Sequence, residues 1–548
     1  MIHLKIKLED LSLREKIGQT ALAFISNDMS DLSKTPYGGM WSIGAIRFTN
    51  VNMDDIATEA VAYAEDSKTR IKGYNSKLKV PILSAMDNMN GIKHAFSELS
   101  FVADCVAVGA TDDEQMAYDA GASRARQLKS TGSSWLWWPE VDLANRNAVI
   151  NWGRLFSDDP KKVSKMAIAA VKGAQEQGVA ATAKHFPGSD EIEYRDPHAS
   201  ASMLNITYEE WEKRQGKLFK ELIDAGVYSV MIGHQSFPGY DNTKINGRYI
   251  PATVSYKIIT ELLKEKMGFS GVVVTDGIGM KGIMDVFDCD EKEIYIAALN
   301  AGNDVILGVN DDYIDIIENA VKEGRVSIER IDDACRRVLE MKEKLGMFKE
   351  GYTCADDSVS EVNKYVKNVN QKIAQNGLTL VTNKKNILPV DKKIIKRVTA
   401  VVLSYDDEQI ESLKIMKEEF NKRGAEFYIK RNLYSYEEIE DISNNCDLII
   451  YIGYLMRGLN NHFREDEKES FNYVMYRGEE KSFGISMGTP NLYFDHFFNF
   501  HTFINCYNFY EETQRALVAA IYGEIPFKGG NPFKLIPDEF KFLKGDQQ

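Results

Sequence analysis

The sequence lacks the features that would direct a protein to a membrane or out of the cell. No apolar run reaches the length of about 18 residues that a membrane-spanning helix needs. The opening stretch MIHLKIKLEDLSLREKIGQT has neither the basic head nor the apolar core of a secretory signal. The 6 cysteines stand singly, without the close pairs typical of zinc ligands or redox motifs. We therefore expect a cytoplasmic protein with reduced cysteines and no membrane contact.

Basic residues are in the minority. The chain has 67 lysines and arginines against 81 aspartates and glutamates, which is a formal net charge of −14. An acidic chain repels nucleic acid and anionic lipid, so neither is expected as a partner. A neutral or cationic small substrate is a better match. At 548 residues, the chain is also too long for one ordinary core, and it has room for a cleft between domains.

Short apolar runs rich in Val, Ile and Ala alternate with segments of helical periodicity, which is typical of parallel β/α units. Candidate strands occur at residues 42–49, 80–87, 133–142, 179–185, 228–234, 271–276 and 303–308. They predict an α/β fold with a (β/α)8 TIM-type barrel over residues 1–349. After a polar linker at 350–365, further candidate strands at 396–404, 425–429, 446–454 and 481–488 predict a smaller C-terminal α/β sandwich domain, with a mainly parallel sheet, at 366–548.

Polar side chains end many of the candidate barrel strands. In a barrel, the carboxyl ends of all strands open onto one face. Residues far apart in sequence would therefore become neighbours there, namely Asp87, Asp142, Lys184, His185, His234 and Asp276.

One of these strand ends carries the motif KHFPG at 184–188, followed by Asp-Pro-His at 196–198. Together they resemble the signature of family 3 glycoside hydrolases of the β-N-acetylhexosaminidase type. Other fragments match that family in its order: LREKIGQ (13–19), PILSAMD (81–87), PEVDLANRNAVINWGRLFSDDP (139–160), GFSGVVVTDGIGM (268–280), AGNDVIL (301–307) and GLTLVTNKKNILPV (377–390). The resemblance runs from roughly residue 12 to 540 and covers both predicted domains.

The resemblance implies a retaining exo-glycosidase that removes terminal β-linked N-acetylglucosamine from small glycosides, such as cell-wall or chitin fragments. Asp276 would be the nucleophile that forms a glycosyl-enzyme. His198 would be the acid/base, held by Asp196. A histidine suits this role because it titrates near neutrality, and an aspartate on its second ring nitrogen fixes the tautomer.

The same resemblance implies which residues bind the sugar. An aspartate that grips hydroxyls, an arginine, a lysine and histidine pair that donates hydrogen bonds, and a further histidine near the cleft correspond to Asp87, Arg154, Lys184, His185 and His234. The mechanism needs no Lewis acid, and the histidines have no metal-binding spacing, so neither a metal nor another cofactor is expected.

Alternatives stay open because the family usually reads D-Q/N-E-G-G where this chain has Asp87-Asn88-Met89-Asn90-Gly91, and Ala95 replaces a frequent arginine. The sugar could be glucose or another hexose. Inorganic phosphate could replace water as acceptor, because a neutral histidine does not repel it. A sugar-binding protein without catalysis is the third alternative. We expect a monomer or a homodimer.

Overall fold

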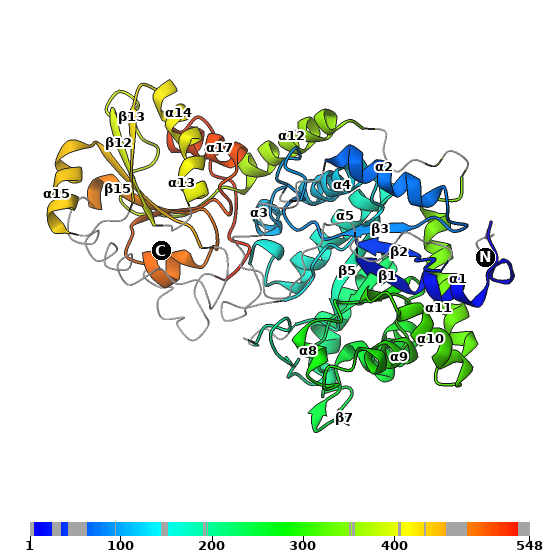
Figure 1. The fold of residues 1–548 in the computed structure, drawn as a ribbon. Coiled ribbons are helices and arrows are strands. Elements are labelled where there is room, and N and C mark those ends of the chain that lie inside the picture. The colour runs from blue at the N-terminus through cyan, green and yellow to red at the C-terminus, as the bar shows by residue number, and fades with distance from the viewer. Residues whose placement is uncertain are drawn as a thin grey trace. The chain divides into compact units, whose positions relative to one another are not determined.

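The computed structural model describes residues 5–24, 34–41, 63–93, 95–143, 152–189, 193, 195–349, 352, 357–403, 407–431, 435–455 and 479–534. The chain forms two compact units (Figure 1). The first comprises residues 1–102, 117–144 and 163–366, and the second comprises 103–116, 145–162 and 367–548. The second unit therefore takes two segments from within the region predicted as barrel, and the division falls inside helix α12 (Val359–Gly377).

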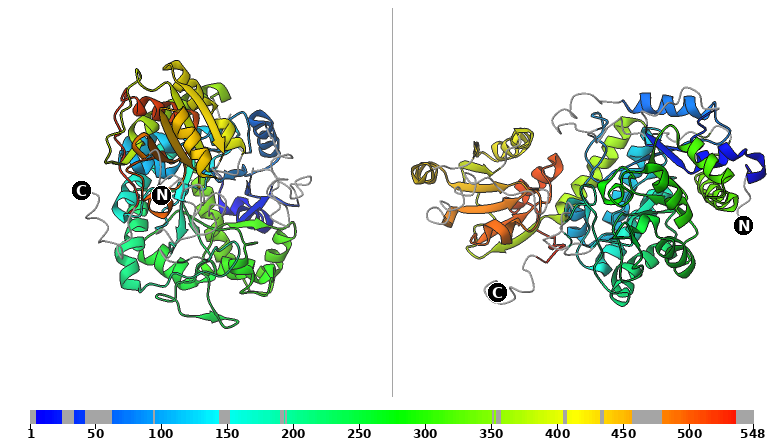
Figure 2. Two further views of the ribbon diagram at one scale, coloured as in Figure 1. Left: turned by 90° about the vertical axis from the view of Figure 1, so that its left-hand side faces the viewer. Right: turned by 60° about the horizontal axis from the view of Figure 1, so that its bottom comes forward.

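The first unit is an eight-stranded parallel barrel with helices outside the strands (Figures 1 and 2). Its strands follow the order β10-β1-β2-β3-β4-β5-β6-β9, and a parallel bridge between Val274 and Val305 joins the two ends. The strands are β1 (Ala21–Phe24), β2 (Gly39–Trp41), β3 (Leu83–Met86), β4 (Trp135–Leu136), β5 (Ala180–Phe186), β6 (Ser229–Ile232), β9 (Val272–Thr275) and β10 (Ile306–Val309). Their residues are nearly all buried because packing covers both faces of a barrel strand.

Helices and short turns connect these strands. The helices are α1 (Leu13–Gln19), α2 (Ala64–Asn75), α4 (Glu114–Ser130), α5 (Pro160–Glu176), α6 (Tyr208–Trp211), α7 (Lys217–Asp224), α8 (Lys281–Met284), α9 (Glu291–Ala301), α10 (Tyr313–Lys322) and α11 (Ile328–Lys344), with a π-helical segment, η6, at Lys257–Lys266. Local chemistry sets their ends. Ser12 and Glu15 form a capping box at the start of α1, and Gly302, at φ 117°, ends α9 in the left-handed region. A small hairpin, β7 (Lys244–Ile245) and β8 (Arg248–Tyr249), projects from this unit (Figure 1).

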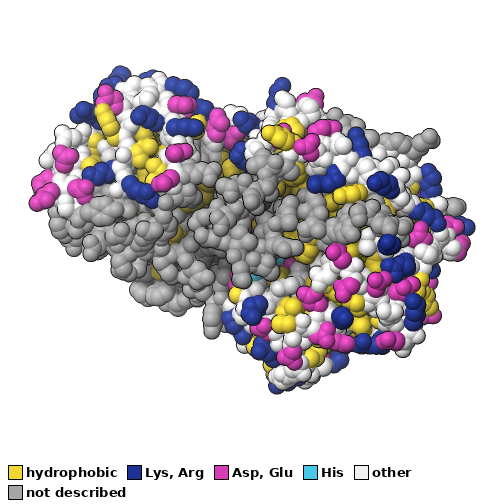
Figure 3. All heavy atoms as spheres, viewed as in Figure 1, with side chains coloured by type: hydrophobic (Ala, Val, Ile, Leu, Met, Phe, Trp, Pro, Cys, Tyr) yellow, Lys and Arg dark blue, Asp and Glu magenta, His cyan; other side chains and the backbone are white. Residues whose placement is uncertain are grey.

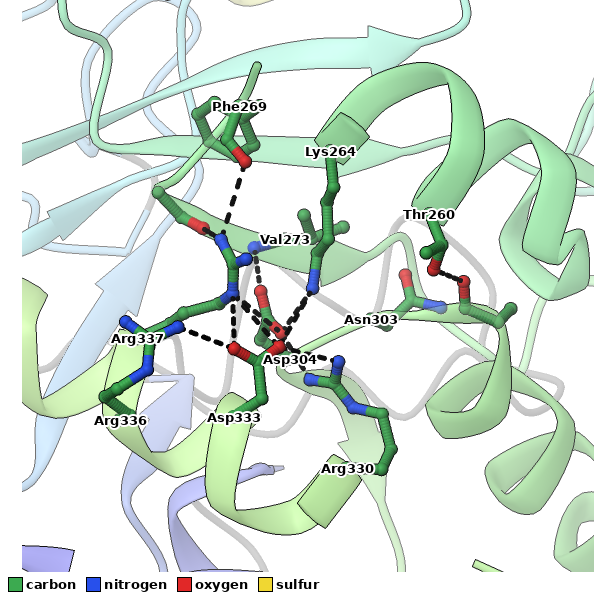
Figure 4. A network of polar contacts seen from close by, with 12 residues as sticks. Thr260, Lys264, Phe269, Val273, Asn303, Asp304, Arg330, Asp333, Arg336 and Arg337 are labelled. Carbon is green, nitrogen blue, oxygen red and sulfur yellow. Dashed lines mark hydrogen bonds and ion pairs between the residues drawn. The ribbon is translucent and has the colours of Figure 1, made fainter. Parts of the chain in front are cut away.

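A buried ionic network stabilises the end of the barrel where β10 begins (Figure 4). Asp304 is fully buried and accepts hydrogen bonds from Lys264 of η6, at 2.7 Å, and from Arg330 of α11, at 2.5 Å. Its second oxygen accepts the backbone N–H of Val273 at 2.9 Å. Asp304 precedes its strand, so this network lies away from the carboxyl ends of the strands, where barrel enzymes place their active sites.

The second unit has a six-stranded sheet in the order β11-β16-β15-β14-β12-β13, parallel except for the pair β11 and β16. Its strands are β11 (Thr379–Asn383), β12 (Arg397–Leu403), β13 (Glu426–Arg431), β14 (Leu448–Gly453), β15 (Ser482–Ser486) and β16 (Thr502–Asn505). Its helices are α3 (Cys105–Thr111), α13 (Asp407–Ser412), α14 (Lys414–Lys422), α15 (Tyr436–Asn445) and α17 (Glu511–Ile521). Alternate strand residues join two apolar clusters, one with α14 and α17 and one with α15, so helices pack on both faces.

The predicted fold class is confirmed: a TIM-type barrel is followed by a smaller α/β domain with a mainly parallel sheet. The candidate strand at 42–49 lies outside the described residues. Six strands of the described residues were not predicted, namely β1, β2, β7, β8, β11 and β16. The sequence of β1 is ALAF, and alanine and leucine favour helices when they are judged locally.

The surface agrees with the composition. On the face drawn in Figure 3, acidic and basic side chains are interspersed over the described atoms and form no block of one sign. Within the described ranges, no helix combines the length and the hydropathy that a membrane span requires.

Candidate active site

Asp276 comes directly after β9, at the carboxyl end of the strand. Its backbone N–H donates to the carbonyl oxygen of Ile232 at 2.9 Å, which continues the pairing with β6. Its Oδ1 accepts the N–H of Gly277 at 2.7 Å, and the side chain is 19% exposed. The carboxylate is therefore held by the backbone at one oxygen and stays partly accessible.

His185, on β5, lies among three carboxylates. Its Nδ1 is 2.7 Å from Oδ2 of Asp142, while its Nε2 is 3.7 Å from Oδ2 of Asp276 and 3.8 Å from Oε1 of Glu140. Burial alone would lower the pKa of this imidazole, but the charges of Asp142, Asp276 and Glu140 outweigh burial and raise it. His185 therefore favours the cationic form beside the Asp276 carboxylate.

The charges around Asp276 keep it ionised. Burial by itself raises the pKa of this carboxyl, but the neighbouring basic groups, His185 first and Lys184 among them, outweigh burial and lower the pKa to about 2. An ionised carboxylate with an accessible oxygen has the properties of a nucleophile at neutral pH.

Asp87 and Lys184 form a second pair at the strand ends. Lys184 Nζ donates to Oδ1 of Asp87 at 2.5 Å. The lysine side chain is only 3% exposed, whereas the Asp87 side chain is 29% exposed. The buried ammonium orients the carboxylate and leaves part of it open to accept hydrogen bonds from a ligand.

His198 and Asp196 form a hydrogen-bonded pair on a loop. His198 Nδ1 lies 2.7 Å from Oδ1 of Asp196, and the same oxygen accepts the His198 backbone N–H at 2.9 Å. The two side chains are 59% and 42% exposed. The backbone N–H of Lys281, five residues after Asp276, donates to the His198 carbonyl oxygen at 3.3 Å, so this loop contacts the segment that follows Asp276.

His234 is surrounded by protein. Its Nδ1 lies 2.6 Å from the Thr253 hydroxyl, and its Nε2 lies 2.9 Å from the carbonyl oxygen of Gly277, the residue after Asp276. Burial is the main reason that the pKa of this histidine is lowered. A neutral His234 that donates from Nε2 supports the backbone beside Asp276. These contacts favour a supporting role, and direct sugar binding by His234 stays a prediction.

Arg154 ends a short 3-10 helix, Trp152–Arg154, which belongs to the second compact unit. Its predicted contact with sugar stays a prediction.

Sequence reasoning missed two residues near the strand ends. Glu140 is 1% exposed and faces His185, and the two acidic positions of the PEVD motif were its only signal. Arg124, on α4, is fully buried and donates to the carbonyl oxygen of Asn88 at 2.9 Å, below the Asp87 loop. Its guanidinium lies 4.2 Å from the centre of the Trp138 ring. No sequence signal pointed to Arg124.

One group of described residues has the spacing of a metal site. Ligand atoms of Glu140, Asp142 and His185 lie within 4.8 Å of one another. However, His185 Nδ1 already shares a hydrogen bond with Asp142, and a metal would have to replace that proton.

The chain was compared with known proteins. The model of the glycosyl hydrolase family 3 N terminal domain matches residues 12–341, more than half of the chain, so the chain belongs to that family and is a glycoside hydrolase. A relative named beta-N-acetylglucosaminidase/beta-glucosidase, from Cellulomonas fimi, is 26% identical over 491 residues, and the match covers 86% of each chain.

Two solved structures share the fold. One is titled beta-glucoside phosphorylase BglX, with a TM-score of 0.82 and 23% identity, over 96% of this chain and 94% of that one. The other is a family 3 beta-N-acetylglucosaminidase from Paenibacillus sp. str. FPU-7, with a TM-score of 0.77 and 22% identity, over 96% of this chain and 99% of that one.

Proposed function

We propose that this glycoside hydrolase is a retaining exo-acting enzyme that removes terminal β-linked N-acetylglucosamine from small glycosides. The observation that carries the proposal is an ionised, partly accessible Asp276 whose following segment is hydrogen-bonded to the loop that bears the His198 and Asp196 pair. A nucleophile and a separate acid/base group are what the two-step retaining mechanism requires.

In the first step, an oxygen of Asp276 attacks the anomeric carbon, the glycosidic bond breaks, and protonated His198 gives its proton to the leaving oxygen. In the second step, neutral His198 takes a proton from water, whose oxygen attacks the same carbon and releases Asp276. Asp196 stabilises the imidazolium form of His198 through Nδ1 in both steps. Two inversions give net retention of configuration.

The sugar would lie against the strand ends. The open part of the Asp87 carboxylate would accept hydrogen bonds from sugar hydroxyls, and cationic His185 would donate from Nε2. The choice of N-acetylglucosamine is supported by the Cellulomonas fimi relative, whose name also includes β-glucosidase activity. A β-glucosidase with the same mechanism is therefore the nearest alternative.

Phosphate as acceptor is a second alternative. A carboxylate base would repel inorganic phosphate, whereas the neutral imidazole of His198 carries no negative charge when the glycosyl-enzyme is resolved. The reaction would then yield a sugar 1-phosphate instead of the free sugar.

The test is turnover of nitrophenyl β-N-acetylglucosaminide beside nitrophenyl β-glucoside, each with and without phosphate. We expect release from the N-acetylglucosaminide, with the β-anomer of the free sugar as first product by NMR. Faster turnover of the glucoside would show that glucose, and not N-acetylglucosamine, is the preferred sugar. A sugar 1-phosphate that forms only when phosphate is added would show that phosphate, and not water, is the acceptor. An α-anomer, or no turnover of any β-hexoside, would contradict the mechanism itself.

The nucleophile is tested by exchange. Asp276→Asn should lower kcat by more than about 10³-fold, because a neutral amide cannot form the glycosyl-enzyme, while binding of the free sugar persists. Asp285→Asn, nine residues later on the same segment, is the matched control and should keep its activity. Equal activity of the two variants would exclude Asp276 as nucleophile.

A further inference from the structure

The segment that follows Asp276 contacts the loop that carries His198. The backbone N–H of Gly282 donates to the carbonyl oxygen of Pro197 at 2.9 Å, and the N–H of Lys281 donates to the carbonyl oxygen of His198 at 3.3 Å. Both donors belong to the first turn of α8, where backbone N–H groups have no partner within the helix. The dyad loop therefore accepts hydrogen bonds from the same short segment that begins at the nucleophile.

Gly282 lets the two backbones come this close. A Cβ at this position would lie 2.7 Å from the Pro197 carbonyl oxygen, and 3.4 Å from both the Ser200 carbonyl oxygen and the His234 Cβ. The nearest of these atoms is backbone, so a side chain cannot be accommodated by a rotamer change of its neighbour. Any residue larger than glycine would move the loop away from α8.

The other end of the segment is also held. The carbonyl oxygen of Gly277 accepts hydrogen bonds from His234 Nε2 at 2.9 Å and from the Met280 N–H at 3.1 Å. The backbone N–H of Asp276 is bonded to Ile232. The segment from Gly277 to Met284 is therefore hydrogen-bonded to the barrel at one end and to the loop with Asp196 and His198 at the other.

We propose that Gly282 is a positioning residue, which seats the 196–198 loop so that the His198 imidazole is within proton-transfer distance of the leaving oxygen. The inference rests on the proposed function, because it gives His198 the acid/base role. Its physical basis is the short range of proton transfer: a general acid must come within about 2.6–3.2 Å of the atom that it protonates. A loop displaced at Pro197 carries the adjacent His198 with it.

The experiment separates acid catalysis from the rest of the reaction. A dinitrophenolate leaving group departs without protonation, whereas the sugar alcohol released from a disaccharide needs a proton. For Gly282→Ala, we expect kcat/KM on the unactivated disaccharide to fall about 10- to 100-fold, part of the contribution that general acid catalysis makes. With the dinitrophenyl glycoside of the same sugar, kcat/KM should change less than about 3-fold, because that ratio reports only the first step.

A second variant tests the other hydrogen bond without adding bulk. Lys281 is the first residue of α8, and proline is tolerated at this position, where it removes the N–H that bonds His198. Met280 before it is extended, with ψ 140°, as a residue before proline should be. Lys281→Pro should show the same split between substrates, and its control Lys281→Ala, which keeps the N–H, should not.

Gly279→Ala is the steric control, because a Cβ there meets no atom within 4 Å. It should leave the ratio of the two kcat/KM values unchanged. Equal losses on both substrates for Gly282→Ala, or no loss on either, would overturn the positioning role. A wild type that hydrolyses neither substrate would instead overturn the proposed function, so the two failures are distinguishable.

Discussion

Three histidines near Asp276 show how environment changes one type of side chain. His185 lies among carboxylates that raise its pKa, and His234 is buried beside neutral partners that leave its pKa lowered. His198 is the exposed member, on a loop, with a carboxylate on Nδ1. A fixed cation, a neutral support and an accessible proton carrier are three different uses of one imidazole.

The pH dependence of kcat/KM tests whether the positive charge of His185 keeps Asp276 ionised. His185→Gln removes a positive charge 3.7 Å from Asp276, the largest influence that opposes burial, so the pKa of that carboxyl would rise. The nucleophile must be ionised to attack, so its lowered pKa keeps activity available in acid, and a raised pKa removes it. We expect the acid limb of kcat/KM, measured from about pH 3 to 9, to move to higher pH.

The control for this profile is His501→Gln, in the second compact unit, where the histidine pairs with Glu479. Its acid limb should coincide with that of the wild type. An acid limb that stays in place in His185→Gln would show that His185 does not keep Asp276 ionised.

At the scale of elements, the barrel is organised with chemistry at one end of its strands and ionic stabilisation at the other. β9 illustrates both, because Asp276 follows its last residue while Val273 near its start donates to buried Asp304. Since the two ends are held by different contacts, stability and catalysis should be separable by mutation.

Asp304→Asn tests that separation. It leaves Lys264 and Arg330 without the buried carboxylate between them, and breaking a buried ion pair in this way costs about 3–5 kcal/mol of unfolding free energy. Tryptophan fluorescence during urea unfolding is a suitable probe, because 5 of the 6 tryptophans belong to the first unit. In the absence of denaturant, the variant should keep its activity.

Asp315→Asn is the matched control, because Asp315 pairs with Arg14 at the surface and its side chain is 67% exposed. This variant should lose less than about 1 kcal/mol of unfolding free energy. Similar losses in the two variants would show that the buried network adds nothing beyond a surface pair.

At the scale of the whole molecule, the two compact units are interleaved in sequence. Segments 103–116 and 145–162 group with residues 367–548. Ala103 N–H donates to Asn370 Oδ1 at 2.9 Å, Gly530 N–H donates to the Ala110 carbonyl oxygen at 2.9 Å, and the Ser157 hydroxyl donates to the Pro532 carbonyl oxygen at 2.5 Å. The predicted boundary at 350–365 would separate these partners.

A chain ended at Lys349 should therefore be poorly soluble. Helix α3, which is buried from Cys105 to Ala110, would lose the second-unit residues that cover it and expose an apolar surface. We expect aggregation and a lower melting temperature by size-exclusion chromatography and calorimetry. Co-expression of residues 350–548 should restore solubility. A monodisperse barrel with the melting temperature of the full chain would contradict this expectation.

Much of the barrel could be predicted from sequence, because apolar runs ending in polar residues report a strand and its exposed end together. Asp87, Lys184, His185 and Asp276 were placed at strand ends in this way, and the structure has them there. Strands were missed where this local pattern of apolar residues was absent or weak. β1 was missed because ALAF has no β-branched residue, and the short runs of β11 and β16 lay among polar and aromatic residues.

The sequence by itself determined the types of element, their order and the chemical groups at the strand ends, because these depend on local patterns of apolar and polar residues. Only the tertiary structure decided which groups meet: Arg124 below the Asp87 loop, His234 on Gly277, and Gly282 against Pro197. Such contacts join residues tens of positions apart, and they depend on packing and loss of solvent. The pattern of apolar and polar residues in a single sequence does not report which residues pack together or which lose contact with solvent.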